Sequence, residues 1–183
     1  MTQSDIIFTF ITIVYGLMLL ELVSRLHLLL RKRKIVKWHF LPILSSWYVF
    51  IMVLRNWWYL SLTEKLVDYS LSEFLFTGHT LIVLYLVTTS VLPDKIDDKG
   101  IDLKMFYFKN HRYFWGVFSF SLFMIQLKNV FIHINSDKLT MSGIIVTFFL
   151  LGISIFLTIN KKYWVHVIGL SLFVINTILE LLF

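Results

Sequence analysis

The sequence predicts an all-α, polytopic transmembrane helical bundle with about six spans. Of its 183 residues, 58% are hydrophobic and only 15% are charged, whereas soluble domains hold about 25% charged residues. The mean hydropathy is +0.79. Apolar residues gather into six runs that approach the roughly 20 residues a helix needs to cross the hydrocarbon layer. We therefore expect one integral membrane domain over residues 1–183.

The six expected spans are 6–30, 38–62, 74–92, 112–134, 141–159 and 163–183. Pro42 lies in the first turn of the second span and Pro93 follows the third, both positions that tolerate proline. Only Asn160, Lys161 and Lys162 separate the last two spans, which predicts a tight hairpin. One long bent helix is the alternative, although it would bury two lysines.

The first apolar run is expected to be a mature span and not a cleaved signal peptide. Asp5 lies among the first residues, and the basic cluster follows the run instead of preceding it.

Lysine and arginine set the orientation, because cytoplasmic loops carry an excess of them. Twelve lie in the first, third and fifth connections and two in the second and fourth. We expect the odd-numbered connections in the cytoplasm and both termini outside, in a bacterial plasma (inner) membrane.

The third connection, 93–111, alternates acidic and basic residues and then turns apolar and aromatic. It predicts either a short amphipathic helix on the membrane interface or a loop whose aromatics begin the fourth span. Residues 95–112 would also suit the recruitment of a cytoplasmic partner protein.

A group of basic and aromatic residues is expected to anchor the chain at the interface and to hold anionic lipid headgroups: Arg31, Lys32, Arg33, Lys34, Arg112, Tyr113 and Trp115.

An internal similarity links the fourth and sixth spans at an offset of 50 residues. Ser121-Leu122-Phe123 aligns with Ser171-Leu172-Phe173, and Gln126 with Asn176. The second span gives a fainter copy around Arg55. The pattern is consistent with three related helical hairpins, and chance similarity between membrane helices is the alternative.

Polar residues from four spans fall at one depth in the outer part of the membrane. Such residues usually face a bundle interior or a water-filled cavity, so their convergence predicts a polar vestibule for a ligand or ion. The alternative is that the long cations reach the headgroups and form a structural ion pair. The candidates are Arg55, Asn56, His79, Gln126, Lys128, Asn129, Asn176 and Glu180.

A second polar pair lies toward the cytoplasm. Glu21 and Arg25 are four residues apart with the glutamate on the N-terminal side, the spacing that allows an ion pair along one helix face. We expect structural pairing, with a proton-sensitive gate as the sharper alternative.

Catalytic and cofactor signatures are missing from the sequence. It has no cysteine, which excludes disulfides and thiolate metal sites, and it carries none of the common catalytic or nucleotide-binding motifs. Six histidines allow a haem between His27 and His166, or between His79 and His133, yet all four lie near the membrane boundaries. We expect no cofactor or metal and no enzymatic activity. Nucleic acid is an unlikely partner, since topology explains the basic loops.

Three functions fit these observations. The leading hypothesis is an ion channel or pore-forming subunit, such as the membrane effector of a stress or defence system. A secondary transporter or a small-molecule or lipid binder is the second. A non-conducting scaffold or regulatory subunit for a cytoplasmic partner is the third. The small size indicates a homo-oligomer or a complex with that partner.

Overall fold

The computed structural model describes residues 3–63, 71–133 and 141–182, with side chains for 4–62, 71–127 and 144–180. The structure is all-helical, with 87% helix in six helices over the described residues, which confirms the all-α prediction. The elements in chain order are α1 (Gln3–Arg31), the 3-10 turn η1 (Arg33–Ile35), β1 (Val36–Lys37), α2 (Phe40–Thr63), α3 (Leu71–Ser90), β2 (Ile101–Asp102), α4 (Leu103–His133), α5 (Met141–Ile159) and α6 (Tyr163–Leu182).

Four described helices, α1, α2, α3 and α6, are long and apolar enough to cross a membrane. Large apolar side chains also cover the outside of the bundle. Leu20 is 61% exposed, Phe149 62% and Ile168 53%. Exposed apolar surface on this scale marks contact with another apolar phase, so the composition and the surface both indicate membrane localisation.

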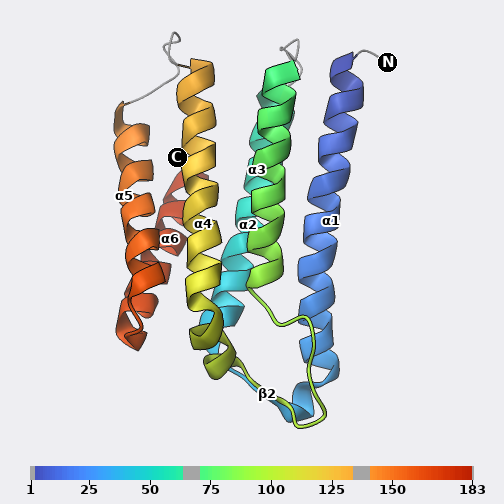
Figure 1. The fold of residues 1–183 in the computed structure, drawn as a ribbon, viewed down its shortest axis with the longest axis vertical. Coiled ribbons are helices and arrows are strands. Elements are labelled where there is room, and N and C mark those ends of the chain that lie inside the picture. Colours follow the sequence, from blue (N-terminus) through green and yellow to red (C-terminus); the bar gives the residue numbers. More distant parts are fainter. Residues whose placement is uncertain (1–2, 64–70, 134–140, 183) are drawn as a thin grey trace.

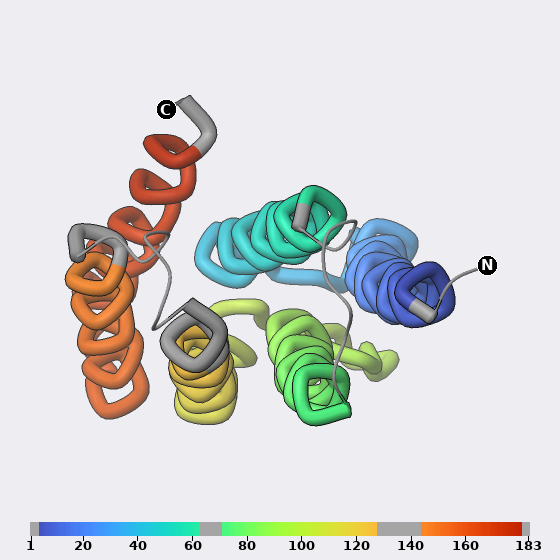
Figure 2. Tube along the Cα trace, turned by 90° about the horizontal axis from the view of Figure 1, so that it is seen from above, coloured from blue at the N-terminus to red at the C-terminus, as the bar shows by residue number. Residues whose placement is uncertain are grey.

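The helices run up and down beside one another (Figure 1). The connections 32–39, 91–102 and 160–162 therefore share one end of the bundle, which we call the basic end. Seen along the bundle, α4 lies between α3 and α5, and α6 inclines away from α2 toward the C-terminus (Figure 2). The alternation of direction makes α2, α4 and α6 parallel to one another.

The tight hairpin expected between the fifth and sixth spans is confirmed. Helix α5 ends at Ile159 and α6 begins at Tyr163. The Asn160 side chain accepts a hydrogen bond from the Lys162 backbone N–H at 2.8 Å, which caps the turn into α6.

The fourth helix begins earlier than expected. Helix α4 is continuous from Leu103, so the aromatics of the third connection form its first turns and no separate interfacial helix precedes them. The Asp102 carboxylate caps this start by accepting from the Met105 backbone N–H at 3.0 Å. The second half of the connection is thus part of the bundle.

The first and third connections join at the basic end through a short parallel strand pair, Val36 with Ile101 and Lys37 with Asp102. The Lys32 ammonium donates to the Ile96 carbonyl at 2.6 Å. A turn closed by the Gly100 N–H and the Asp97 carbonyl, 2.9 Å apart, brings the chain back to β2. These contacts make the two connections one structural unit, which we call the cap.

Gly100 is the residue on which the cap depends most directly. Its φ is +84°, and a Cβ there would lie 2.1 Å from the Ile35 carbonyl oxygen. Gly100→Ala should therefore lower the free energy of unfolding by at least about 1–3 kcal/mol, measured by thermal or denaturant unfolding in detergent. Gly78→Ala is the matched control, because a Cβ at Gly78 meets nothing within 4 Å. Equal stability of the two variants would contradict this account of the turn.

Candidate functional site

The three parallel helices α2, α4 and α6 meet in an aromatic layer. Ring centroids of Tyr48 on α2 lie 5.8 Å from Phe118 on α4 and 5.6 Å from Phe173 on α6. Phe118 and Phe173 meet edge to face at 5.2 Å, and Trp115 stacks on Phe173 at 5.6 Å. Trp115, Phe118 and Phe173 are fully buried. We call the contact line of these three helices the seam, and the layer fills its middle.

A charged layer lies further along the seam, away from the basic end. Arg55 is seven residues beyond Tyr48, and Glu180 is seven beyond Phe173. Seven residues are almost two helical turns, so each pair shares one helix face about 10 Å apart. The Arg55 guanidinium forms an ion pair with the Glu180 carboxylate, and Asn176 donates to that carboxylate at 2.7 Å. The predicted ion pair is therefore formed between α2 and α6.

Further polar groups accompany this layer. Gln126 is buried on α4, eleven residues beyond Trp115, which places it on the same helix face about 16 Å away. Thr177 on α6 is buried and donates to the Phe173 carbonyl at 3.1 Å. The Tyr48 hydroxyl lies next to Thr177 and within the field of Arg55. Polar groups thus border the aromatic layer on the side away from the basic end.

Toward the basic end the seam holds a directed hydrogen-bond chain. The Trp115 indole N–H, which can only donate, donates a hydrogen bond to the Tyr107 hydroxyl oxygen at 3.0 Å. The Asn160 carbonyl can only accept, so His166 Nε2 carries a proton and donates to it at 2.8 Å. In a neutral imidazole Nδ1 then holds the lone pair and accepts from the Tyr107 hydroxyl at 3.0 Å. The geometry fits neutral His166.

Tyr107 is the branch point of this chain. It precedes the span expected from residue 112, and burial raises the pKa of its hydroxyl, outweighing the lowering by Trp115 and Ser45. The hydroxyl therefore keeps its proton at physiological pH. Ser45 on α2 lies close enough to influence that pKa, although its buried Oγ makes no hydrogen bond within standard limits in the described part of the chain.

His111 lies beside this chain and is 2% exposed. Its Nδ1 donates to the Phe108 carbonyl at 2.7 Å, which leaves the lone pair of a neutral ring on Nε2. That nitrogen is buried without a hydrogen-bond partner among the described residues. The ring meets His166 at right angles, with centroids 5.4 Å apart. We call Tyr107, His111 and His166 the histidine cluster.

The basic end of the seam is covered by a polar and aromatic rim. The Tyr163 ring meets His39 at 5.8 Å and Phe40 at 6.2 Å. The Lys104 ammonium lies 5.3 Å from the Tyr163 ring centroid, a cation–π arrangement. Tyr163 also contacts Phe108, whose ring contacts both histidines, so the rim adjoins the histidine cluster.

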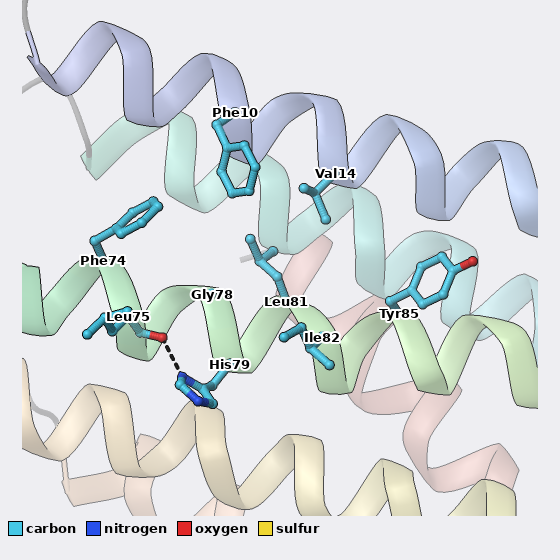
Figure 3. Close-up of a pocket in the computed structure, with 9 residues that line it drawn as sticks. All are labelled: Phe10, Val14, Phe74, Leu75, Gly78, His79, Leu81, Ile82 and Tyr85. Carbon is cyan, nitrogen blue, oxygen red and sulfur yellow. Dashed lines mark hydrogen bonds between the residues drawn. The ribbon is translucent and has the colours of Figure 1, made fainter.

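The other predicted vestibule residues lie elsewhere. His79 is exposed on α3, where its Nδ1 donates to the Leu75 carbonyl at 2.7 Å. It borders an apolar groove of about 380 Å³ between α1 and α3 (Figure 3). Asn56 donates to the Met52 carbonyl of its own helix at 2.9 Å. The side chains of Lys128 and Asn129 lie outside the described residues.

The Glu21–Arg25 pairing is confirmed, with Arg25 Nε 2.7 Å from the carboxylate. Arg25 does more than pair. Its Nη1 donates to the carbonyls of Thr89 and Leu92, at 2.6 and 2.8 Å, which are acceptors left open where α3 ends. The pair thus fastens α1 to the C-terminal end of α3, a second role that the spacing of the two residues does not predict.

The structure corrects two of the expected interface residues. Trp115 is fully buried, because its indole points into the seam instead of toward lipid. Lys32 is turned into the cap by its bond to Ile96. The remaining members are exposed at the basic end, where headgroups would reach them: Arg31, Arg33, Lys34, Arg112 and Tyr113.

The described histidines are poorly arranged for haem or metal. Both ring nitrogens of His166 already make hydrogen bonds, so neither is free to ligate. No group of three metal-binding side chains occurs within residues 3–63, 71–133 and 141–182. The side chain of His133 lies outside the described residues.

The chain matches no protein-family model, no curated protein and no solved structure.

We expect Glu21 and Arg25 to act as a structural fastener. Arg25→Met should lower the free energy of unfolding by about 2–4 kcal/mol, since it leaves Glu21 and two carbonyls unpaired. Adding Glu21→Gln should cost little more, because the interaction is already lost. Denaturant unfolding in detergent measures both, with Ser24→Ala, an exposed neighbour, as control. Additive losses in the double variant would contradict the coupling.

Proposed function

We propose that this protein is a six-span channel or pore-forming subunit of a bacterial plasma membrane, with the seam between α2, α4 and α6 as its route. The observation that carries the proposal is the stack of three layers along one seam: the histidine cluster, the aromatic layer and the Arg55–Glu180 pair. The basic end is assigned to the cytoplasm, because its short connections carry most of the lysine and arginine.

The layers are long enough to serve as a transmembrane route. From Tyr107, at the cytoplasmic interface before the expected span, to Gln126, α4 rises about 28 Å. The seam therefore reaches from that interface across most of the roughly 30 Å hydrocarbon core. Polar groups in membrane helices usually mark ion or substrate pathways. Here they occupy both ends of the same seam, and they come from three helices.

The middle of the route is closed in this structure. Phe118, Phe173 and Trp115 are fully buried in mutual contact, and apolar constrictions of this kind gate channels by excluding water. Opening would require the aromatic rings to separate, most directly by a tilt of α6.

A secondary transporter is supported by the parallel arrangement of α2, α4 and α6, the three helices of the predicted hairpin repeat. The aligned positions differ in environment, however: Phe173 is fully buried in the seam, whereas Phe123 is 46% exposed. The transporter would also use the seam, so the two readings share a route and differ in kinetics. A scaffold reading is supported by the cap, in which hydrogen bonds join the two longest basic connections.

Removal of a ring from the aromatic layer should open the route. We expect Phe118→Ala and Phe173→Ala to raise passive ion flux at least ~10-fold in proteoliposomes of purified protein, because they remove the side chains that exclude water. The matched control is Phe123→Ala, which removes an exposed ring from α4, the helix that carries Phe118. Thermal unfolding of each variant shows whether it is folded.

Three outcomes separate the hypotheses. Leak that rises in the two seam variants and stays at the wild-type level in the control supports the channel. Saturable, gradient-coupled uptake by the wild type supports the transporter. Unchanged, negligible flux in all folded variants removes both and leaves the scaffold.

The orientation is tested by single cysteines, since the natural chain has none. Asp97→Cys in the cap should react with a membrane-impermeant thiol reagent only after the cells are opened. Ser72→Cys, at the opposite end of α3, should react in intact cells. The reverse labelling pattern would overturn the cytoplasmic assignment of the basic end.

A further inference from the structure

We infer that the histidine cluster binds a single proton from the cytoplasm and that this proton loosens the seam. The inference rests on the proposed function, because it names what regulates the same route. It is carried by the burial and hydrogen bonding of His111 and His166 at the inner end of the aromatic layer.

His111 Nε2 is the nitrogen that accepts the proton. Three of the four ring nitrogens in the two histidines are committed: His166 donates to Asn160 and accepts from Tyr107, and His111 donates to Phe108. Only His111 Nε2 holds an unused lone pair, and it is buried with no partner among the described residues. A buried polar atom without a partner is rare in native structures and requires an explanation.

The cluster takes one proton and not two. The ring centroids of His111 and His166 are 5.4 Å apart, and two like charges at that distance disfavour each other strongly when both are buried. Among the described residues, the titratable groups that meet His166 are Tyr107 and His111, both from α4. Lys104 and His39 meet the rim at Tyr163 and not the cluster itself.

Protonation works against the closed packing. An imidazolium at His111 would present an Nε2–H that finds no acceptor in the present arrangement, and burial disfavours the charged ring. Solvation of the ring relieves both costs and requires the inner seam to open. The closed form therefore binds the proton less tightly than the open form, so acid shifts the population toward the open form.

Trp115 carries the change to the aromatic layer. It donates to Tyr107 within the histidine cluster and stacks on Phe173 in the layer. A displacement of Tyr107 therefore moves a ring that covers the closed part of the route. Trp115 therefore contacts both the histidine cluster and the aromatic layer.

Flux with independent pH control on the two sides tests the inference. In proteoliposomes, lowering the cytoplasmic-side pH from 7.5 to 5.5 should raise wild-type flux several-fold, because histidine is the side chain type that gains charge in this pH range. His111→Gln should remove the response, because its side chain does not titrate. His79→Gln, which alters an exposed histidine outside the seam, should keep it. A flat wild-type profile, or an unchanged response in His111→Gln, would overturn the inference.

Histidine ¹⁵N NMR of the wild type in detergent gives a readout that needs no flux and no variant that folds poorly. At neutral pH it should show His111 protonated on Nδ1 and His166 on Nε2. Acid should add one proton to the pair. One-proton binding without any flux would retain the proton site and reject the channel. Two independent protonations, or none, would reject the site whatever the flux.

Discussion

The seven-residue register between α2 and α6 is the constraint on which the seam depends. Tyr48 meets Phe173, and seven residues further along each helix Arg55 meets Glu180. Because seven residues return to nearly the same helix face, a single relative placement of the two helices satisfies both contacts. A slip of one turn would separate the two ions and lose their pairing. Charge pairing thus fixes the register, and the aromatic layer fixes the spacing.

This constraint is important for α6 in particular. The helix inclines away from α2 toward its C-terminus (Figure 2), and the Arg55–Glu180 pair ties the two where they diverge. At the other end, His166 holds α6 to α4 through Tyr107. Both ties are polar, and the apolar layer lies between them. In the proposed channel, a change in either tie would alter the tilt of α6 and so part Phe173 from Phe118.

The sequence predicts the coarse structure well because lipid imposes strong composition rules. Long apolar runs, the three-residue corner at Asn160–Lys162 and the Glu21–Arg25 spacing each depend on local pattern, and the structure contains the helices, the hairpin and the pair. The joint placement of Arg55, Asn176 and Glu180 was also foreseeable from depth alone. Depth does not specify which way a side chain faces, which is why His79 lies exposed at the edge of the groove between α1 and α3 and Trp115 lies in the core.

The histidine cluster was harder to predict for a related reason. His111 comes from a connection expected at the interface and His166 from the cytoplasmic end of the sixth expected span. The early start of α4 at Leu103 is what brings Tyr107 and His111 into the bundle. One signal was present in the sequence. His111 precedes Phe118 by seven residues, and His166 precedes Phe173 by seven, the same step that links Phe173 to Glu180. A search for polar residues at heptad distance from large aromatics would have found all three layers.

The order of the layers has an electrostatic reason. The centre of a bilayer is the most costly place for a charge, so polar groups are tolerated near the two ends of the seam and rings occupy the middle. In the proposed channel the barrier to ions and water lies at Phe118 and Phe173, and the two histidines proposed to bind the proton lie about two helical turns away. Control at a distance requires a side chain that belongs to both regions. Trp115 is that side chain, since its N–H belongs to the polar region and its ring to the apolar one.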